Sequence, residues 1–189
     1  VGVAATFRTP DANKDGSASR SITYGANVGS MVNSTKFVNA VVTDANNSVK
    51  VAGELIGALG HFSLQSEYFY AQVDRKDNLE KYKAWGAYGQ VGFIAIGSGY
   101  EYATSWARLE LPKPGTLEFA VRYSCLDLNN SDSAIYGGEQ QQLTLGCNYY
   151  WKKFIRLRLN YNYVHLDKHA LNGKEDFNFL SARVQVFFN

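Results

Sequence analysis

Four arginines in the second half of the chain stand where their side chains could bind an anion together. They are Arg122, Arg156, Arg158 and Arg183, and each lies in a segment of alternating apolar and polar residues, such as IRLRLNYNYVHL at 155–166. Alternate residues of a β-strand point to opposite faces, so the arginines would share one polar face. A guanidinium is a permanent cation with a fork of N–H donors that suits phosphate. The expected chemistry is therefore anion binding.

Two amides, Asn160 and Gln185, extend this polar face with neutral hydrogen-bond donors. In the predicted last hairpin Arg158 lies opposite Arg183, and like charges directly opposite each other destabilise a sheet. The arrangement indicates either a site that receives an anion or an acidic partner elsewhere in the protein.

A second pairing places the preceding turn at about Lys152, so that Asn148 lies opposite Arg156. Both pairings keep the polar residues on one face and the apolar residues on the other. A slip of one residue would break this agreement, because it would reverse every side chain of a strand.

The elements that carry these residues are predicted to be β-strands, since a period of two residues dominates almost the whole chain. About nine strands are expected, at 1–9, 18–29, 48–59, 61–73, 82–95, 115–128, 139–150, 153–166 and 176–188. Several reach about ten residues or more, the length with which a tilted strand crosses a bilayer. No apolar run is long enough for a membrane-spanning helix. The predicted class is all-β and antiparallel.

The two faces of the strands differ in chemistry. Leucine, valine and tyrosine line one face, while arginine, glutamine, asparagine and serine line the other. The polar face would be costly in a dry core without partners, and a water-filled lumen removes that cost. We therefore predict a transmembrane β-barrel wall with lipid outside and arginines inside.

The connections between strands also alternate. Tight turns are predicted at 59–61 and 150–152, and longer polar loops at 74–81, 129–138 and 167–175. Short turns on one rim and long loops on the other are typical of outer-membrane barrels. The long link 96–114 falls on the short-turn rim, where an additional hairpin would preserve the alternation.

Several segments resemble the phosphate- and pyrophosphate-selective outer-membrane porins. They are GELIGALGHFSLQSEYFYAQVDR (53–75), LEFAVRYSCLDLNN (117–130), GGEQQQLTLGCNYYWKKFIRLRLNYNYVHLD (137–167) and DFNFLSARVQVFFN (176–189). In residues 1–47 the best local match is NSTKFVNAVV (33–42).

The resemblance implies a barrel of about sixteen strands, an even number as in other single-chain bacterial barrels. It further implies a homotrimer in the outer-membrane lipid of Gram-negative bacteria that passes small inorganic anions through a basic lumen. Residues 1–189 would then be the C-terminal part of one transmembrane barrel domain. The family's constriction loop comes from the N-terminal half, so no constriction residue is carried over to this chain.

The expected function is passive diffusion of small anions, with phosphate or polyphosphate as candidate solutes, and no catalytic activity. Two alternatives remain open: a general non-selective or structural outer-membrane barrel, and a soluble β-barrel that binds a small ligand. A net charge of +2 is too small to favour a nucleic-acid binder. No nucleophile and base are paired in the sequence, and no cofactor is expected.

Three weaker patterns favour no metal site and no disulfide. DANKDG (11–16) matches the start of a calcium loop but has Ile22 where the bidentate glutamate belongs. His165, Asp167 and His169 cluster in a loop and lack the ligand set of a zinc site. Cys125 and Cys147 could be cross-strand neighbours, although two outward-facing free thiols are favoured over a strained disulfide.

Overall fold

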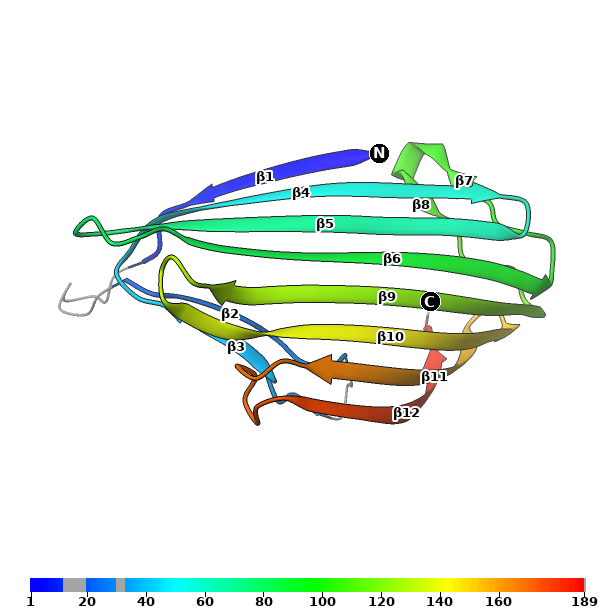
Figure 1. The fold of residues 1–189 in the computed structure, drawn as a ribbon. Helices are drawn as coiled ribbons and strands as arrows, with labels where there is room; N and C mark the ends of the chain where they lie inside the picture. Colours follow the sequence, from blue (N-terminus) through cyan, green and yellow to red (C-terminus); the bar gives the residue numbers. More distant parts are fainter. Residues whose placement is uncertain (12–19, 30–32, 189) are drawn as a thin grey trace.

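The computed structural model describes residues 1–11, 20–29 and 33–188, and most of the calcium-loop-like segment lies outside them. Eight strands form one antiparallel sheet in the order β1-β4-β5-β6-β9-β10-β11-β12 (Figure 1). Their bounds are β1 Gly2–Arg8, β4 Ala45–Leu59, β5 Phe62–Arg75, β6 Tyr82–Ile96, β9 Thr116–Asn130, β10 Ile135–Lys152, β11 Ile155–Leu166 and β12 Glu175–Val186. The predicted all-β, antiparallel class is confirmed.

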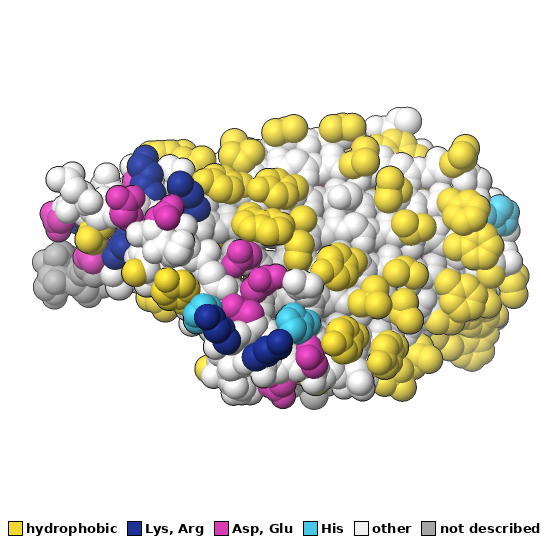
Figure 2. Space-filling view, in the orientation of Figure 1, with side chains coloured by type: hydrophobic (Ala, Val, Ile, Leu, Met, Phe, Trp, Pro, Cys, Tyr) yellow, Lys and Arg dark blue, Asp and Glu magenta, His cyan; other side chains and the backbone are white. Residues whose placement is uncertain are grey.

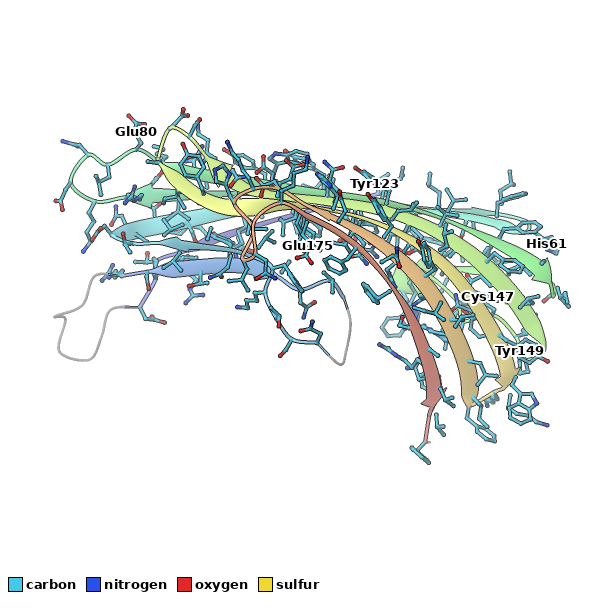
Figure 3. All side chains as sticks on the ribbon, turned by 60° about the horizontal axis from the view of Figure 1, so that its bottom comes forward. His61, Glu80, Tyr123, Cys147, Tyr149 and Glu175 are labelled. Atoms are coloured by element: carbon cyan, nitrogen blue, oxygen red, sulfur yellow. The ribbon has the colours of Figure 1, made fainter. Side chains whose placement is uncertain are left out.

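The sheet is a curved, open wall rather than a closed barrel, with β1 and β12 at its edges. Figure 3 shows the strands bending together, which gives the wall a concave and a convex face. The strands from β4 to β12 that belong to this wall are 12 to 18 residues long. Such lengths agree with tilted membrane-crossing strands. Among the described residues, no helix has the length and apolar character that crossing a membrane requires.

The prediction of nine wall strands was wrong for the segment 18–29. Its strand, β2 (Ile22–Ala26), pairs only with β3 (Val38–Val42), and this hairpin lies against the concave side of the wall (Figure 3). Val38, Ala40 and Val42 are buried among wall residues. Apolar and polar residues alternate in this segment because one side of the hairpin packs on the wall. A wall strand shows the same period of two residues, so the sequence pattern does not distinguish the two.

A glycine lets the hairpin approach the wall closely. A Cβ atom at Gly137 of β10 would lie 2.6 Å from the Cβ of Ala40, 2.9 Å from its backbone nitrogen and 2.8 Å from the Cβ of Leu128. Loop contacts hold the hairpin as well, since the Leu171 N–H donates to the Phe37 carbonyl over 2.8 Å. Any side chain at Gly137 would therefore displace the hairpin.

The long link on the short-turn rim contains a small hairpin that forms its own two-stranded sheet and adds no strand to the wall. It consists of β7 (Tyr102–Ala103), the 3-10 turn η1 (Thr104–Trp106) and β8 (Arg108–Leu109). The Tyr100 N–H donates to the Gly60 carbonyl over 2.8 Å, which attaches the link to the neighbouring β4–β5 turn.

One of the two predicted hairpin pairings is confirmed and the other is wrong. Arg158 lies opposite Arg183 as predicted, whereas Asn148 lies opposite Arg158 instead of Arg156. The turn predicted at 150–152 lies instead between Lys152 and Ile155, and the register shifts between Tyr150 and Lys152. The observed partner of Asn148 is two residues away from the predicted one, so the side chains of β11 keep their predicted face.

The two cysteines are not cross-strand neighbours. Cys125 lies opposite Gln141, Cys147 lies opposite Phe119, and both thiols are free. The register differs from the predicted one because β10 already begins at Ile135, inside the stretch predicted as a loop.

Candidate anion pathway on the concave wall

The convex face of the wall is apolar over most of its height. Hydrophobic side chains spread across it toward the short-turn rim, while acidic and basic side chains gather near the long-loop rim (Figure 2). The exposed apolar residues of this face include Phe119, Val121, Tyr123, Leu143, Leu145, Leu159, Tyr161, Tyr163, Leu180 and Val184. A surface of this kind suits lipid contact, with tyrosines close to the polar rim.

All six residues predicted to line a pathway lie on the concave face. They are Arg122 on β9, Arg156, Arg158 and Asn160 on β11, and Arg183 and Gln185 on β12. They alternate in step with the buried wall residues Leu128 and Val164, which pack against the β2–β3 hairpin. Since alternate residues share a face, the arginines point to the same side as the hairpin.

Arg158 and Arg183 form the centre of the candidate site. They are cross-strand partners, and Arg156 and Gln185 form the next pair on this face. Within the described residues no carboxylate lies within ion-pair distance of Arg158 or Arg183. The Nε of Arg158 is also buried without a hydrogen-bond partner. The pair therefore presents two positive charges that form no ion pair with a carboxylate among the described residues.

Arg156 is held differently from its neighbours. Its side chain is only 6% exposed, and its guanidinium carbon lies 4.6 Å from the ring centroid of Tyr150 and 5.6 Å from that of Phe187. Cation–π contacts of this kind favour a cation beside aromatic rings. Arg156 thus adds a fixed positive charge beneath the surface, with little area for direct contact with a solute.

Arg122 lies apart from the other three arginines, opposite Thr144 rather than beside Arg158. Its guanidinium stacks 3.6 Å from the Tyr88 ring centroid, and the Tyr88 hydroxyl donates to Glu67 over 2.8 Å. A polar hollow of about 430 Å³ connects the Arg122 and Arg158 positions. Its lining consists of Gly29, Gln90, Glu118, Ala120, Arg122, Gln142, Thr144, Gly146, Asn148, Tyr150, Arg158, Asn160 and Asn162.

Glu118 is the carboxylate in this hollow, and hydroxyl and amide groups satisfy it. It accepts hydrogen bonds from the hydroxyls of Tyr100 (2.5 Å) and Tyr150 (2.8 Å) and from the Asn148 amide (3.0 Å). No sequence signal pointed to Tyr100, because it reaches the wall from the link between β6 and β9.

Two other carboxylates, Glu54 and Glu67, are direct cross-strand partners on β4 and β5. Glu67 alternates in step with Val73, which is buried against the β2–β3 hairpin, so both carboxylates lie on the concave face. The concave face therefore carries this pair of carboxylates and Lys50 on β4 and β5, and it carries Glu118 together with the arginines on β9, β11 and β12.

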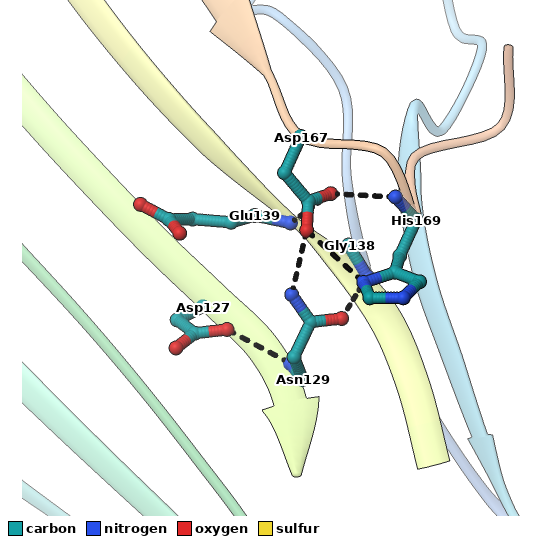
Figure 4. Close-up of polar contacts among 6 residues, drawn as sticks. All are labelled: Asp127, Asn129, Gly138, Glu139, Asp167 and His169. Atoms are coloured by element: carbon teal, nitrogen blue, oxygen red, sulfur yellow. Dashed lines mark hydrogen bonds and ion pairs between the residues drawn. The ribbon is translucent and has the colours of Figure 1, made fainter. Parts of the chain in front are cut away.

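The loop cluster of histidine and aspartate has a structural role in the described part of the protein. Asp167 accepts hydrogen bonds from the backbone N–H groups of Glu139 (2.9 Å) and His169 (3.0 Å) and from the Asn129 amide (2.9 Å) (Figure 4). His165 pairs instead with Asp176. The described residues contain no group of three or more potential ligands placed to hold a metal ion.

These hydrogen bonds determine the charge state of Asp167, which lies in the loop beyond β11. Partial burial alone would raise the pKa of its carboxyl group. The hydrogen bonds from Glu139, Asn129 and His169 outweigh burial and hold that pKa below its usual range. A carboxyl group with a lowered pKa stabilises the fold while it is ionised.

We expect Asp167→Asn to lower the free energy of unfolding by about 1 kcal/mol at pH 7, since charge-assisted hydrogen bonds are lost. The contribution is fully present above about pH 4, the unfolded pKa, and disappears as the pH falls through the lower folded pKa. Urea unfolding of the full-length protein in detergent, in a pH series, measures it. The control is Asp132→Asn in the exposed β9–β10 loop. A deficit that persists unchanged at about pH 2 would contradict the assignment.

Comparison with known proteins supplies the family. The family model described as phosphate-selective porin O and P matches residues 1–188. Porin O of Pseudomonas aeruginosa is 27% identical over 145 residues, which cover 69% of this chain and 33% of that protein. The chain thus spans about a third of the length of the curated relative that it matches. The match over nearly the whole chain shows that it belongs to the phosphate-selective porin O and P family.

Proposed function

We propose that this chain forms part of an outer-membrane porin through which small anions, phosphate or polyphosphate among them, diffuse passively. The observation that carries the proposal is the Arg158–Arg183 pair on the concave face. Two like charges directly opposite each other destabilise a sheet unless something neutralises them. A passing anion would neutralise them transiently. The same repulsion between the two arginines that destabilises the sheet would therefore favour binding of an anion.

Membership of the family places the chain in the bacterial outer membrane and favours a channel over an enzyme. In our proposal the convex apolar face contacts lipid and the concave face lines the lumen. The remaining strands of the barrel would come from the rest of the full-length protein, with this chain as its C-terminal part, and three copies would associate.

The proposed mechanism is electrostatic. Fixed positive charges in a confined space raise the local concentration of anions and lower the barrier to entry. Arg158 and Arg183 would contact the anion directly, and Arg156 would contribute its charge from beneath the surface. Asn160 and Gln185 would offer neutral donors that release the anion more readily than a guanidinium does.

The test is the current of the full-length protein in a planar bilayer, with phosphate exchanged for chloride and the reversal potential measured in a salt gradient. We expect an anion-selective current that phosphate reduces at low concentration, since phosphate binds arginine more strongly than chloride. A weakly selective current that phosphate leaves unchanged would instead support a general pore. Inserted protein without any current would support a structural barrel.

A further inference from the structure

An apolar pocket interrupts the polar concave face where the β2–β3 hairpin meets the wall. Its volume is about 230 Å³, and its lining includes Tyr24, Lys50, Ala52, Phe69, Ala71 and Ala84. It lies on strands β1, β4, β5, β6 and β9 beside β2, away from Arg158 and Arg183 on β11 and β12. A wall that only lines a water-filled lumen requires no apolar pocket. An apolar pocket with a few polar groups is instead typical of a binding site for a small molecule.

The floor of the pocket consists of small side chains around one large one. Phe69 lies opposite Ala52 on one side and Gly86 on the other, and Ala71 lies opposite Ala84. Phe69 is 45% exposed although it points to the concave face, where polar side chains prevail. The small neighbours leave its ring open to contact from the lumen side.

One end of the pocket is polar and incompletely satisfied. The Tyr24 hydroxyl is buried without a hydrogen-bond partner among the described residues. The ring of Tyr24 stacks on Tyr82, whose own hydroxyl donates to the Leu128 carbonyl over 2.9 Å. The Lys50 ammonium lies 5.1 Å from the Tyr24 ring centroid. A buried hydroxyl normally has a partner, and this one is available to a ligand atom that enters the pocket.

We propose that this pocket binds organic anions: a single aromatic ring or short alkyl group that carries a phosphate, phosphonate or carboxylate. The ring would pack on Phe69 and Ala71, and Lys50 and Tyr24 would contact the acid group. A cavity of about 150 Å³ accommodates benzene, so this pocket has room for one substituted ring. The inference rests on the proposed function only in that the concave face must be accessible to solutes.

The experiment is calorimetric titration of the full-length protein in detergent with phenylphosphonate and methylphosphonate, which carry the same acid group. We expect phenylphosphonate to bind about tenfold more tightly, because its ring buries apolar surface. Lys50→Gln and Phe69→Ala should each weaken phenylphosphonate binding about tenfold and leave binding of inorganic phosphate unchanged. The matched control is Lys83→Gln, which removes a lysine from the opposite, convex face of β6.

A second variant, Ala71→Leu, fills the pocket while Lys50, Tyr24 and Phe69 remain in place, and it should abolish the preference for the phenyl group. Equal affinity for the two phosphonates in the wild-type protein would overturn the proposal. So would an unchanged phenyl preference in Ala71→Leu, or an unchanged affinity for phenylphosphonate in Lys50→Gln. Because the titration requires no current, its failure is distinguishable from failure of the bilayer test of anion selectivity.

Discussion

Arg158→Glu in the full-length porin should shift the permeability ratio of anions to cations toward cations by about tenfold or more, a change of about 1.4 kcal/mol in relative barriers. The substitution replaces a positive charge by a negative one directly opposite Arg183. The new carboxylate would pair with Arg183, so one substitution removes both free cations of the pair. Reversal potentials in a salt gradient across a planar bilayer measure the effect.

Two controls separate charge from fold. Arg158→Lys keeps the charge but loses the forked donor, so selectivity should persist while the effect of phosphate weakens. Lys83→Glu makes the same change of charge on the convex face of β6 and should leave selectivity unchanged. An unaltered permeability ratio in Arg158→Glu would remove the arginine pair from the anion pathway.

The faces of the wall strands were predictable because alternation is a local property of an extended chain. Arg158 and Asn160 lie on the predicted face although Asn148 does not lie opposite the predicted residue. An even shift in register leaves every face unchanged, whereas exact partners depend on turns and irregularities such as the one at Tyr150–Lys152. The sequence therefore predicts which side chains face the lumen better than it predicts their neighbours.

The interior hairpin and the contacts of Glu118 were not predictable in this way. Ile22–Ala26 alternates like a wall strand, and only packing on distant residues places it against the concave face. Glu118 receives Tyr100 from an irregular link. Both depend on contacts between residues far apart in the sequence, which periodicity does not encode. The pocket beside Tyr24 exists only because the hairpin lies there.

Gly137→Val should displace the β2–β3 hairpin from the wall. The added Cβ atom would meet Ala40 and Leu128 at distances well below van der Waals contact, and part of the obstruction is backbone. Overpacking of this kind costs about 2 kcal/mol, so the hairpin should separate while the wall strands remain paired. We expect the single-channel conductance to increase, because the hairpin lies on the side proposed to be the lumen.

Gly89→Val is the matched control, since a Cβ atom at Gly89 of β6 meets nothing within 4 Å. It should leave the conductance unchanged, and limited proteolysis should cleave the hairpin faster only in Gly137→Val. If the conductance of Gly137→Val equals that of the wild type although proteolysis shows the hairpin released, the hairpin does not narrow the pore. In that case the arginines of β11 and β12 would account for the selectivity, and the width of the pore at the hairpin would not contribute. Arg158→Glu tests the effect of charge on selectivity, and Gly137→Val tests the effect of pore width.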